Sequence, residues 1–314
     1  MIDVFKEKTT MRWTLLLIFL GLAWGATIPL NKLAVAGEHS TAALVFWQQL
    51  AGFALLLAWQ SFRRLKGQRR GARPQWGLYF IVASLGTLLP HGLSFAAVSM
   101  VQANMMSIGI AVTPMAAYMI ALGLGRETLS LRRGSGLLLG ATSILLLLGI
   151  SLTLLGQQAA WGIAIALLPG LCYAAESNVI AASARDRFDP VETLFYASGL
   201  SCLLALPLVF GCGTDPLALA TLSLSFTALI LSGLLHVLCY AAYFAIVART
   251  GAVFASQVAY FVTIGGFLSG TLFLNETAPP ALIVSLGLMV LGVGLVRPRP
   301  QQRQRLDIAD SFNG

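Results

Sequence analysis

The sequence predicts an all-α integral membrane protein whose ten transmembrane helices form two inverted five-helix repeats. Composition supplies the first reason, because 57% of the 314 residues are hydrophobic and only 10% are charged. An ordinary soluble domain carries about 25% charged residues, so the chain is not a mainly soluble protein. The distribution of apolar runs and an internal repeat supply the other two reasons.

The apolar residues gather in long runs that short polar segments separate. A helix crosses a bilayer with about 20 predominantly apolar residues. The first run is followed directly by a second and lacks a small-residue cleavage site, so we expect a retained helix and not a signal peptide. The predicted spans are residues 13–35, 40–62, 76–98, 101–123, 134–155, 160–184, 191–211, 223–247, 250–274 and 279–296.

The basic residues decide the orientation of these spans. All of the 20 Lys and Arg residues except Lys32 fall before the first span or in the segments after every second span. The alternate segments hold none, so the positive-inside rule predicts that both termini are cytoplasmic. A net charge of +8 distributed in this way indicates a multi-pass protein of the cytoplasmic (inner) membrane and no nucleic-acid partner.

The chain repeats itself at an offset of 149 residues without a gap. The matching positions include Phe46 and Phe195, Phe95-Ala96 and Phe244-Ala245, and Glu127-Thr128 and Glu276-Thr277. Because five is an odd number, the second repeat must enter the membrane from the opposite side. We therefore expect a cytoplasmic N-terminus over 1–12, a first repeat over 13–155, an inverted second repeat over 160–296 and a cytoplasmic tail over 297–314.

Three motifs resemble a known family. They are WGATIPLNK in the first span (residues 24–32), FAAVSMVQAN (residues 95–104) between the third and fourth spans, and the Glu-Thr pair that opens the last hairpin of each repeat. Together they are similar to EamA-type members of the drug/metabolite transporter superfamily. The resemblance covers residues 13–296 and implies alternating access around a central cavity, with the fifth and tenth helices at the periphery. Many members carry an arginine in the second helix where this chain has Gln48 and Gln49, so no role is taken from that arginine.

Polar side chains recur at three- and four-residue spacing inside several spans, which places them on one helix face. A polar group within lipid needs a partner or water. Thr27 and Ser94 share these faces, whereas the fifth and tenth spans are almost entirely aliphatic and are expected to face lipid. The side chains predicted to line a substrate pathway are Trp24, Asn31, Lys32, Gln48, His91, Gln102, Tyr173, Glu176, His236, Tyr240, Tyr243 and Tyr260.

Glu176 is the only acidic residue well inside a predicted span, and with His91 and His236 it is a candidate for proton coupling. An intramembrane carboxyl group can exchange a proton or bind a substrate ammonium, and the alternative is a structural hydrogen bond between helices. The histidines likewise either contact protons and substrate or only hydrogen-bond. Lys32 either reaches the lipid headgroups or serves gating or a substrate carboxylate. The aromatic residues either stack on a flat or cationic ligand or only pack and anchor helices.

Prolines and glycines within spans indicate where helices bend and touch. The hinge candidates are Pro29, Pro90, Pro114 and Pro169, although membrane helices also hold prolines for packing alone. Gly21-x-x-x-Gly25 and Gly136-x-x-x-Gly140 favour close helix contacts, the second either within the chain or in a homodimer.

No motif points to catalysis. The four cysteines, Cys172, Cys202, Cys212 and Cys239, have neither metal-ligand spacing nor an extracellular pairing pattern. A phosphate-binding loop, a nucleophile motif and a His/Cys cluster are all missing from the sequence. We therefore predict no metal, no cofactor and no catalytic residues.

The predicted function is secondary-active transport of small polar metabolites, with efflux of amino acids or related compounds as the leading hypothesis. Substrate and direction follow from the resemblance, since family members export amino acids and other metabolites and some relatives import vitamins or nucleotide-linked sugars. The nearest alternative is an importer of a vitamin or nucleotide-like compound, as in riboflavin-type uptake. A membrane-embedded enzyme is a remote alternative because no catalytic set lies at one depth. The expected partners are a small-molecule substrate and the lipid bilayer.

Overall fold

The structure is a computed structural model that describes residues 15–37, 39–66, 74–150, 152–153, 156–183, 189–211, 223–250 and 258–295. Its elements are helices, as predicted. Among the described residues, eight helical segments have the length and apolarity to cross a membrane, and two further apolar helices are shorter. The chain is thus a multi-pass membrane protein, while the count of ten spans stays a prediction. The predicted terminal segments 1–12 and 297–314 lie outside the described residues.

The helices alternate with short connections along both repeats. In the first repeat the segment Leu15–Val35 ends in α2 (Thr27–Val35) and is followed by α3 (Thr41–Leu65), α4 (Trp76–Ile81), the π-helix η1 (Val82–Leu88), α5 (Leu89–Met100), α6 (Ala103–Ile110), α7 (Thr113–Gly123) and α8 (Leu131–Ile150). The second repeat contains α9 (Gln157–Ser183), α10 (Pro190–Gly211), α11 (Leu224–Thr250), α13 (Val258–Phe273) and α14 (Pro280–Leu295). α4, η1 and α5 form one continuous span, and α6 and α7 form another.

The helix boundaries follow the 149-residue offset. Thr41, the first residue of α3, corresponds to Pro190, the first residue of α10. Leu131, the first residue of α8, corresponds in the same way to Pro280, the first residue of α14. The repeat seen in the sequence is therefore also a repeat of secondary structure.

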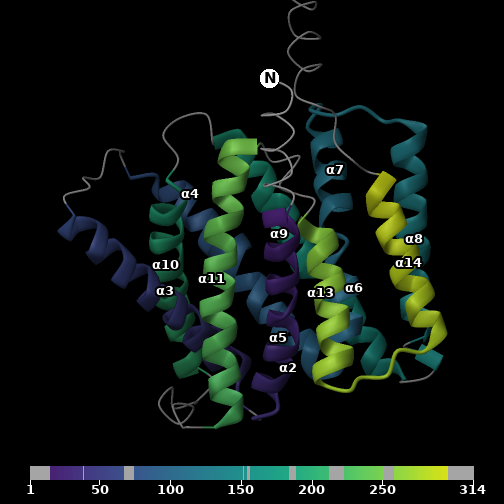
Figure 1. Cartoon of the computed structure of the whole chain (residues 1–314), viewed down its shortest axis with the longest axis horizontal. Coiled ribbons are helices and arrows are strands. Elements are labelled where there is room, and N and C mark those ends of the chain that lie inside the picture. Colours follow the sequence, from purple (N-terminus) through teal and green to yellow (C-terminus); the bar gives the residue numbers. More distant parts are fainter. Residues whose placement is uncertain are drawn as a thin grey trace, which may run out of the picture.

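The two repeats pack into each other and do not form separate halves (Figure 1). α3 packs against α10, α6 against α13, and α8 against α14. In the picture the first of these pairs lies at the left and the last at the right. α2 packs against α11, and their repeat equivalents α9 and α5 also pack against each other. An approximate two-fold axis between the repeats produces this pattern, because it maps each helix onto its equivalent and each contact between repeats onto the corresponding contact.

Both glycine motifs make close helix contacts within the chain. A Cβ added to Gly25 would lie 2.5 Å from the Gly266 nitrogen, so the first span approaches α13 backbone to backbone. A Cβ on Gly292 of α14 would lie 2.7 Å from the Gly136 oxygen and 2.9 Å from the Gly140 nitrogen. The face of Gly136-x-x-x-Gly140 is thus covered by α14, and the homodimer that this motif left open would need another surface.

Three of the four hinge candidates lie where a helix changes geometry. Pro29 lies in the first turn of α2, directly after a turn that interrupts the first span. Pro90 is the second residue of α5 and follows η1, and Pro114 is the second residue of α7 and follows a turn. Proline is tolerated there because the first N–H groups of a helix have no intrahelical partner. Pro169 lies inside α9.

The fifth span begins earlier than predicted. α8 starts at Leu131 and not at residue 134, so Arg133 belongs to its first turn and not to a basic loop. The Arg133 side chain is only 6% exposed and donates a hydrogen bond of 2.6 Å to Glu127 Oε2. Its guanidinium also lies 4.9 Å from the ring centroid of Tyr118. A buried cation requires a partner, and the pair with Glu127 lets the helix extend through this residue.

Candidate functional site

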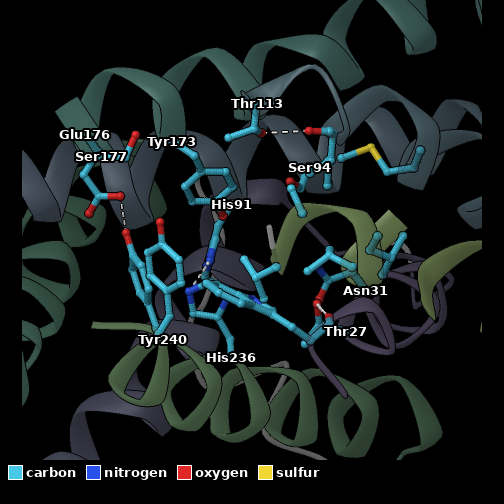
Figure 2. A pocket seen from close by; sticks show the side chains of 18 of the residues that line it. Thr27, Asn31, His91, Ser94, Thr113, Tyr173, Glu176, Ser177, His236 and Tyr240 are labelled. Atoms are coloured by element: carbon cyan, nitrogen blue, oxygen red, sulfur yellow. Dashed lines mark hydrogen bonds between the residues drawn. The ribbon is translucent and has the colours of Figure 1, made fainter. Parts of the chain in front are cut away.

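A cavity of about 120 Å³ lies between helices of both repeats. Figure 2 shows Glu176, Ser177 and Tyr240 at one side of it and Thr27 and Asn31 at the other, with His91 and His236 between them. Nine of the twelve residues predicted for the pathway line this cavity: Trp24, Asn31, Gln48, His91, Tyr173, Glu176, His236, Tyr240 and Tyr243.

The other three predicted residues lie elsewhere. Lys32 Nζ donates to the carbonyl oxygens of Val98 and Val101, at 2.6 Å and 2.8 Å, and is not among the lining residues. Gln102 precedes α6, outside the cavity. Tyr260 packs at the edge of the hydrophobic core. The lysine therefore binds the carbonyl oxygens at the end of α5 and does not line the cavity.

Glu176 is the only charged residue among the described residues that line the cavity, and it is 3% exposed. Its Oε2 accepts a hydrogen bond from the Tyr240 hydroxyl. Its Oε1 has no hydrogen-bond partner in the described part of the chain. A Cβ at Gly86 of η1 would collide with this carboxylate and with the Tyr240 hydroxyl. The glycine in this π-helix therefore makes room for the Glu176–Tyr240 pair, in keeping with the frequent occurrence of π-helical turns at functional sites.

Four side chains form a hydrogen-bonded chain along the cavity wall. Trp24 Nε1 donates to His236 Nδ1 at 3.0 Å, His236 Nε2 lies 3.2 Å from His91 Nε2, and His91 Nδ1 lies 2.7 Å from the Gln49 amide. An indole N–H can only donate, so His236 accepts at Nδ1 and carries its proton on Nε2. It then donates to His91 Nε2, which leaves the His91 proton on Nδ1.

This order of protons determines the orientation of the Gln49 side-chain amide. The structure places Gln49 Nε2 beside His91 Nδ1. The proton order requires the amide to be turned so that its oxygen lies there, because the nitrogen would force His236 to accept at both ring nitrogens. Amide oxygen and nitrogen are assigned from such networks. Each imidazole is then neutral, donates once and accepts once, so the pair carries no charge in this arrangement.

A second polar cluster joins three helices beside the histidines. Gln48 Nε2 of α3 donates to Asn31 Oδ1 of α2 at 3.1 Å and to Ser232 Oγ of α11 at 2.9 Å. Ser232 Oγ donates in turn to Asn31 Oδ1 at 2.6 Å. All three side chains are buried. The amides thus hold α2, α3 and α11 together at the uncharged side of the cavity.

Repeat-equivalent positions line the same cavity. The offset of 149 residues relates Trp24 to Tyr173, Thr27 to Glu176, His91 to Tyr240 and Ser94 to Tyr243. The cavity therefore lies where the two repeats meet, close to the approximate two-fold axis. Transporters with inverted repeats bind their substrates at such a position.

The cavity also contains residues that the sequence did not single out. Thr113 and Ser177 contribute hydroxyl groups, and Met106, Ile110 and Val262 form part of an apolar wall. Only their sequence positions could have indicated Ser177 and Thr113, because Ser177 follows Glu176 and Thr113 precedes Pro114. Apolar wall residues have no signal at all, because lipid-facing positions have the same composition.

Glu276 ties one end of the bundle across the two repeats. Its Oε1 accepts from the Ala103 backbone N–H at 2.6 Å, and its Oε2 accepts from that of Asn104 at 2.8 Å. The carboxylate thus caps the first turn of α6, where a negative charge also interacts favourably with the helix dipole. The positive-inside rule predicts that this end, which also holds Lys32, is the outer one.

A multi-pass chain that encloses a cavity between two sequence repeats has an architecture typical of secondary transporters. The profile of the EamA-like transporter family matches residues 11–149 and 160–297, one copy on each repeat. The chain therefore belongs to the EamA-like transporter family, and the resemblance inferred from the motifs is confirmed. It is accordingly a transporter of the drug/metabolite superfamily.

Among curated proteins no significant match is found. A solved crystal structure superimposes with a TM-score of 0.59 at 16% identity, over 93% of this chain and 97% of the other. At that identity the likeness concerns the fold alone.

Proposed function

We propose that this protein is a secondary-active transporter of the cytoplasmic membrane that exports small polar metabolites, with amino acids or related compounds as the substrate set. The repeats insert with opposite orientation, both termini lie in the cytoplasm, and the cavity opens to one side at a time. Family membership, the one-sided distribution of Lys and Arg, and the cavity between the repeats support this proposal.

The observation that carries the proposal is that repeat-equivalent residues line one cavity. When two inverted repeats rock against each other, their equivalent helices exchange roles at the two ends, and the cavity opens to the other compartment. Glu276 and Lys32 tie the predicted outer end in this structure. That arrangement fits a conformation in which the outer end is closed.

Glu176 is the residue best suited to couple transport to protons. It is buried, it faces the cavity, and one of its oxygens has no partner among the described residues. Intramembrane carboxyl groups frequently belong to substrate and proton pathways. His91 and His236 are the second candidates. Their hydrogen bonds with Trp24 hold them neutral, so protonation of either ring would rearrange this chain and could be coupled to movement of the helices.

Reconstitution in liposomes tests the proposal. Counterflow is measured with labelled amino acids, amines, vitamins and nucleotides, with and without a pH gradient. We expect exchange of amino acids or their derivatives, its loss in Glu176→Gln, and reduced exchange in His91→Ala and His236→Ala. Unchanged flux and unchanged pH dependence in all three variants would contradict the assigned site. Exchange of vitamins or nucleotides alone would favour the importer.

Glu192→Gln is the matched control. Glu192 is also a buried carboxylate that accepts from a tyrosine, Tyr79, at 3.4 Å, but it does not line the cavity. The Glu192→Gln variant should exchange substrate at the same rate as the unmodified protein. A tag at the C-terminus tests the topology separately, and a tag found outside the cell would contradict the proposed orientation.

A further inference from the structure

The charges around the cavity narrow the class of substrate. We infer that the substrate is an organic monocation, with an ammonium group bound at Glu176, an uncharged and largely apolar body, and no free carboxylate. This inference rests on the proposed function, because it takes the cavity as the substrate site. Within the proposed set of amino acids and related compounds, the inference therefore selects amines and other derivatives without a carboxylate and excludes the zwitterionic amino acids themselves.

The cavity offers a carboxylate and no cation among its described lining residues. Glu176 is its only charged side chain there. Lys32, the one basic residue that the sequence puts inside a span, is bound by the carbonyl oxygens of Val98 and Val101. A zwitterion would bring a carboxylate into a site whose described lining residues include no cation to pair it, and a buried charge without a counter-ion is strongly unfavourable.

The two histidines do not fill the role of the missing cation. His236 Nδ1 already accepts from Trp24, and His91 Nε2 accepts from His236. An added proton on either ring would turn one of these acceptors into a donor and break that hydrogen bond. The pair is therefore built to be neutral, and a substrate carboxylate gains no counter-ion from it while the chain is intact.

Aromatic rings gather around the same carboxylate. The ring centroid of Trp24 lies 5.4 Å from that of Tyr240 and 5.9 Å from that of Tyr243. The Tyr240 hydroxyl donates to the Glu176 carboxylate, and Tyr173 and Tyr243 line the same cavity. Aromatic faces attract a cation within about 6 Å. A carboxylate with an unpartnered oxygen, surrounded by rings, is thus suited to an ammonium group.

Among the described lining residues, the side of the cavity opposite Glu176 has neither a charged side chain nor a tyrosine. The repeat equivalents of Glu176 and Tyr243 are Thr27 and Ser94, which line the cavity as neutral hydroxyl groups near Asn31. In Figure 2, Thr27 and Asn31 lie on the side away from Glu176. The apolar residues described above form part of the wall. This arrangement matches a molecule with one cationic end and an uncharged body.

Binding to the full-length protein in detergent tests the inference with three probes. Phenethylamine, phenylalanine and hydrocinnamate share one ring and carry an ammonium, both charges, and a carboxylate, respectively. A ligand that binds only the folded state raises the melting temperature. We expect phenethylamine to raise it and to bind at least about tenfold more tightly than phenylalanine, a difference that one unpaired charge readily supplies. Hydrocinnamate should produce no shift.

Equal or tighter binding of phenylalanine or hydrocinnamate would overturn the inference, and so would the absence of any shift with phenethylamine. Glu176→Gln should weaken phenethylamine binding by about 30-fold or more, because it removes the charged partner of a buried pair. Glu192→Gln should leave it unchanged. The melting temperature without ligand shows that each variant is folded, and a folded Glu176→Gln protein that binds normally would also overturn the inference.

Tyr243 gives a second test that does not touch the carboxylate. Tyr243→Phe keeps the ring and should retain phenethylamine binding, whereas Tyr243→Leu removes it and should weaken binding by about three- to thirtyfold. Equal binding by these two variants would contradict the role of the ring.

Counterflow separates this inference from the proposed function. Exchange of phenylalanine without binding of phenethylamine would overturn the substrate class and leave the transporter in place. No exchange of any compound in the panel would instead remove the proposed function, whatever binds in detergent.

Discussion

Glu127 and Glu276 occupy equivalent positions of the two repeats, each followed by a threonine, but they bind different partners. Glu276 reaches across the repeat interface and accepts from the backbone N–H groups of Ala103 and Asn104. Glu127 stays within its own repeat and accepts from Arg133 in the first turn of α8. The same motif thus joins the repeats at one end and stabilises a single repeat at the other.

The sequence explains this difference. The position equivalent to Arg133 in the second repeat is the buried Leu282. Glu276 therefore has no arginine at that position, and its carboxylate is available to cap α6. In a transporter that alternates between two conformations, a contact between repeats must break when that end opens, whereas a contact within a repeat persists. We therefore expect Glu127 to govern stability and Glu276 to govern the balance between conformations.

Removal of the Glu127 carboxylate should have the largest effect. Glu127→Leu leaves the buried Arg133 guanidinium without this carboxylate and should lower the free energy of unfolding by about 3–5 kcal/mol, as for other buried pairs that lose one partner. The double variant Glu127→Leu/Arg133→Leu should return to within about 1 kcal/mol of the unmodified protein. Unfolding in mixed micelles measures both. A single variant as stable as the double one would refute a structural role for the pair.

Glu276→Gln should act on conformation instead. The neutral amide cannot make two charge-assisted hydrogen bonds, so the end that we propose to be outer and closed should lose about 1.5–3 kcal/mol of stabilisation. The measurement is the rate at which a membrane-impermeant thiol reagent, added outside, labels Ser94→Cys in a Cys172→Ser/Cys212→Ser background. Labelling should accelerate while the global unfolding free energy changes less than in Glu127→Leu. If global stability falls as far and labelling stays slow, the contrast between the two glutamates is wrong.

α8 and α14, the fifth helices of the two repeats, pack against each other at a closely packed contact. Gly292→Ala should lower the unfolding free energy by about 1–3 kcal/mol, because its Cβ would meet the Gly136 and Gly140 backbone of α8. Gly287→Ala, on the same helix, meets nothing within 4 Å and should raise stability by about 0.5–1 kcal/mol. Thermal unfolding in detergent compares the two. Equal effects would mean that α8 and α14 do not pack as closely as the structure has them.

The cavity could be predicted in large part because polar residues are conspicuous in lipid. Glu176, His91 and Tyr240 stand out at helical spacing inside apolar runs, and the structure brings them to one cavity. The partners of Lys32 and Glu276 could not be predicted, because both bind backbone groups at helix ends. Such groups exist at every helix terminus and have no side-chain signature.

The role of Gly86 could not be predicted from the sequence for a related reason. Its importance depends on a π-helical turn and on a carboxylate from another helix. The residues around Gly86 predict neither the π-helical backbone nor the approach of α9. The start of α8 was misplaced because Arg133 counted as a loop cation, and only its pairing with Glu127 makes it a helix residue.

Lys32→Met is the smallest and most specific test of the difference between the two ends. The equivalent residue in the second repeat is Ala181, so this link exists at one end only. Val98 and Val101 lie at the C-terminal end of α5, where carbonyl oxygens lack intrahelical partners and favour a cation. Methionine keeps the apolar stem and loses the ammonium. Because Lys32, Val98 and Val101 all belong to the first repeat, the link persists when the end opens, and its loss should lower the free energy of unfolding by about 1 kcal/mol.

Labelling of Ser94→Cys from the outer side should therefore stay at the rate of the unmodified protein, and Lys32→Arg should restore the lost stability. Faster labelling in Lys32→Met would contradict this expectation and would show that the lysine also keeps the proposed outer end closed. The two ends would then differ in this lysine as well as in the partners of their shared glutamates.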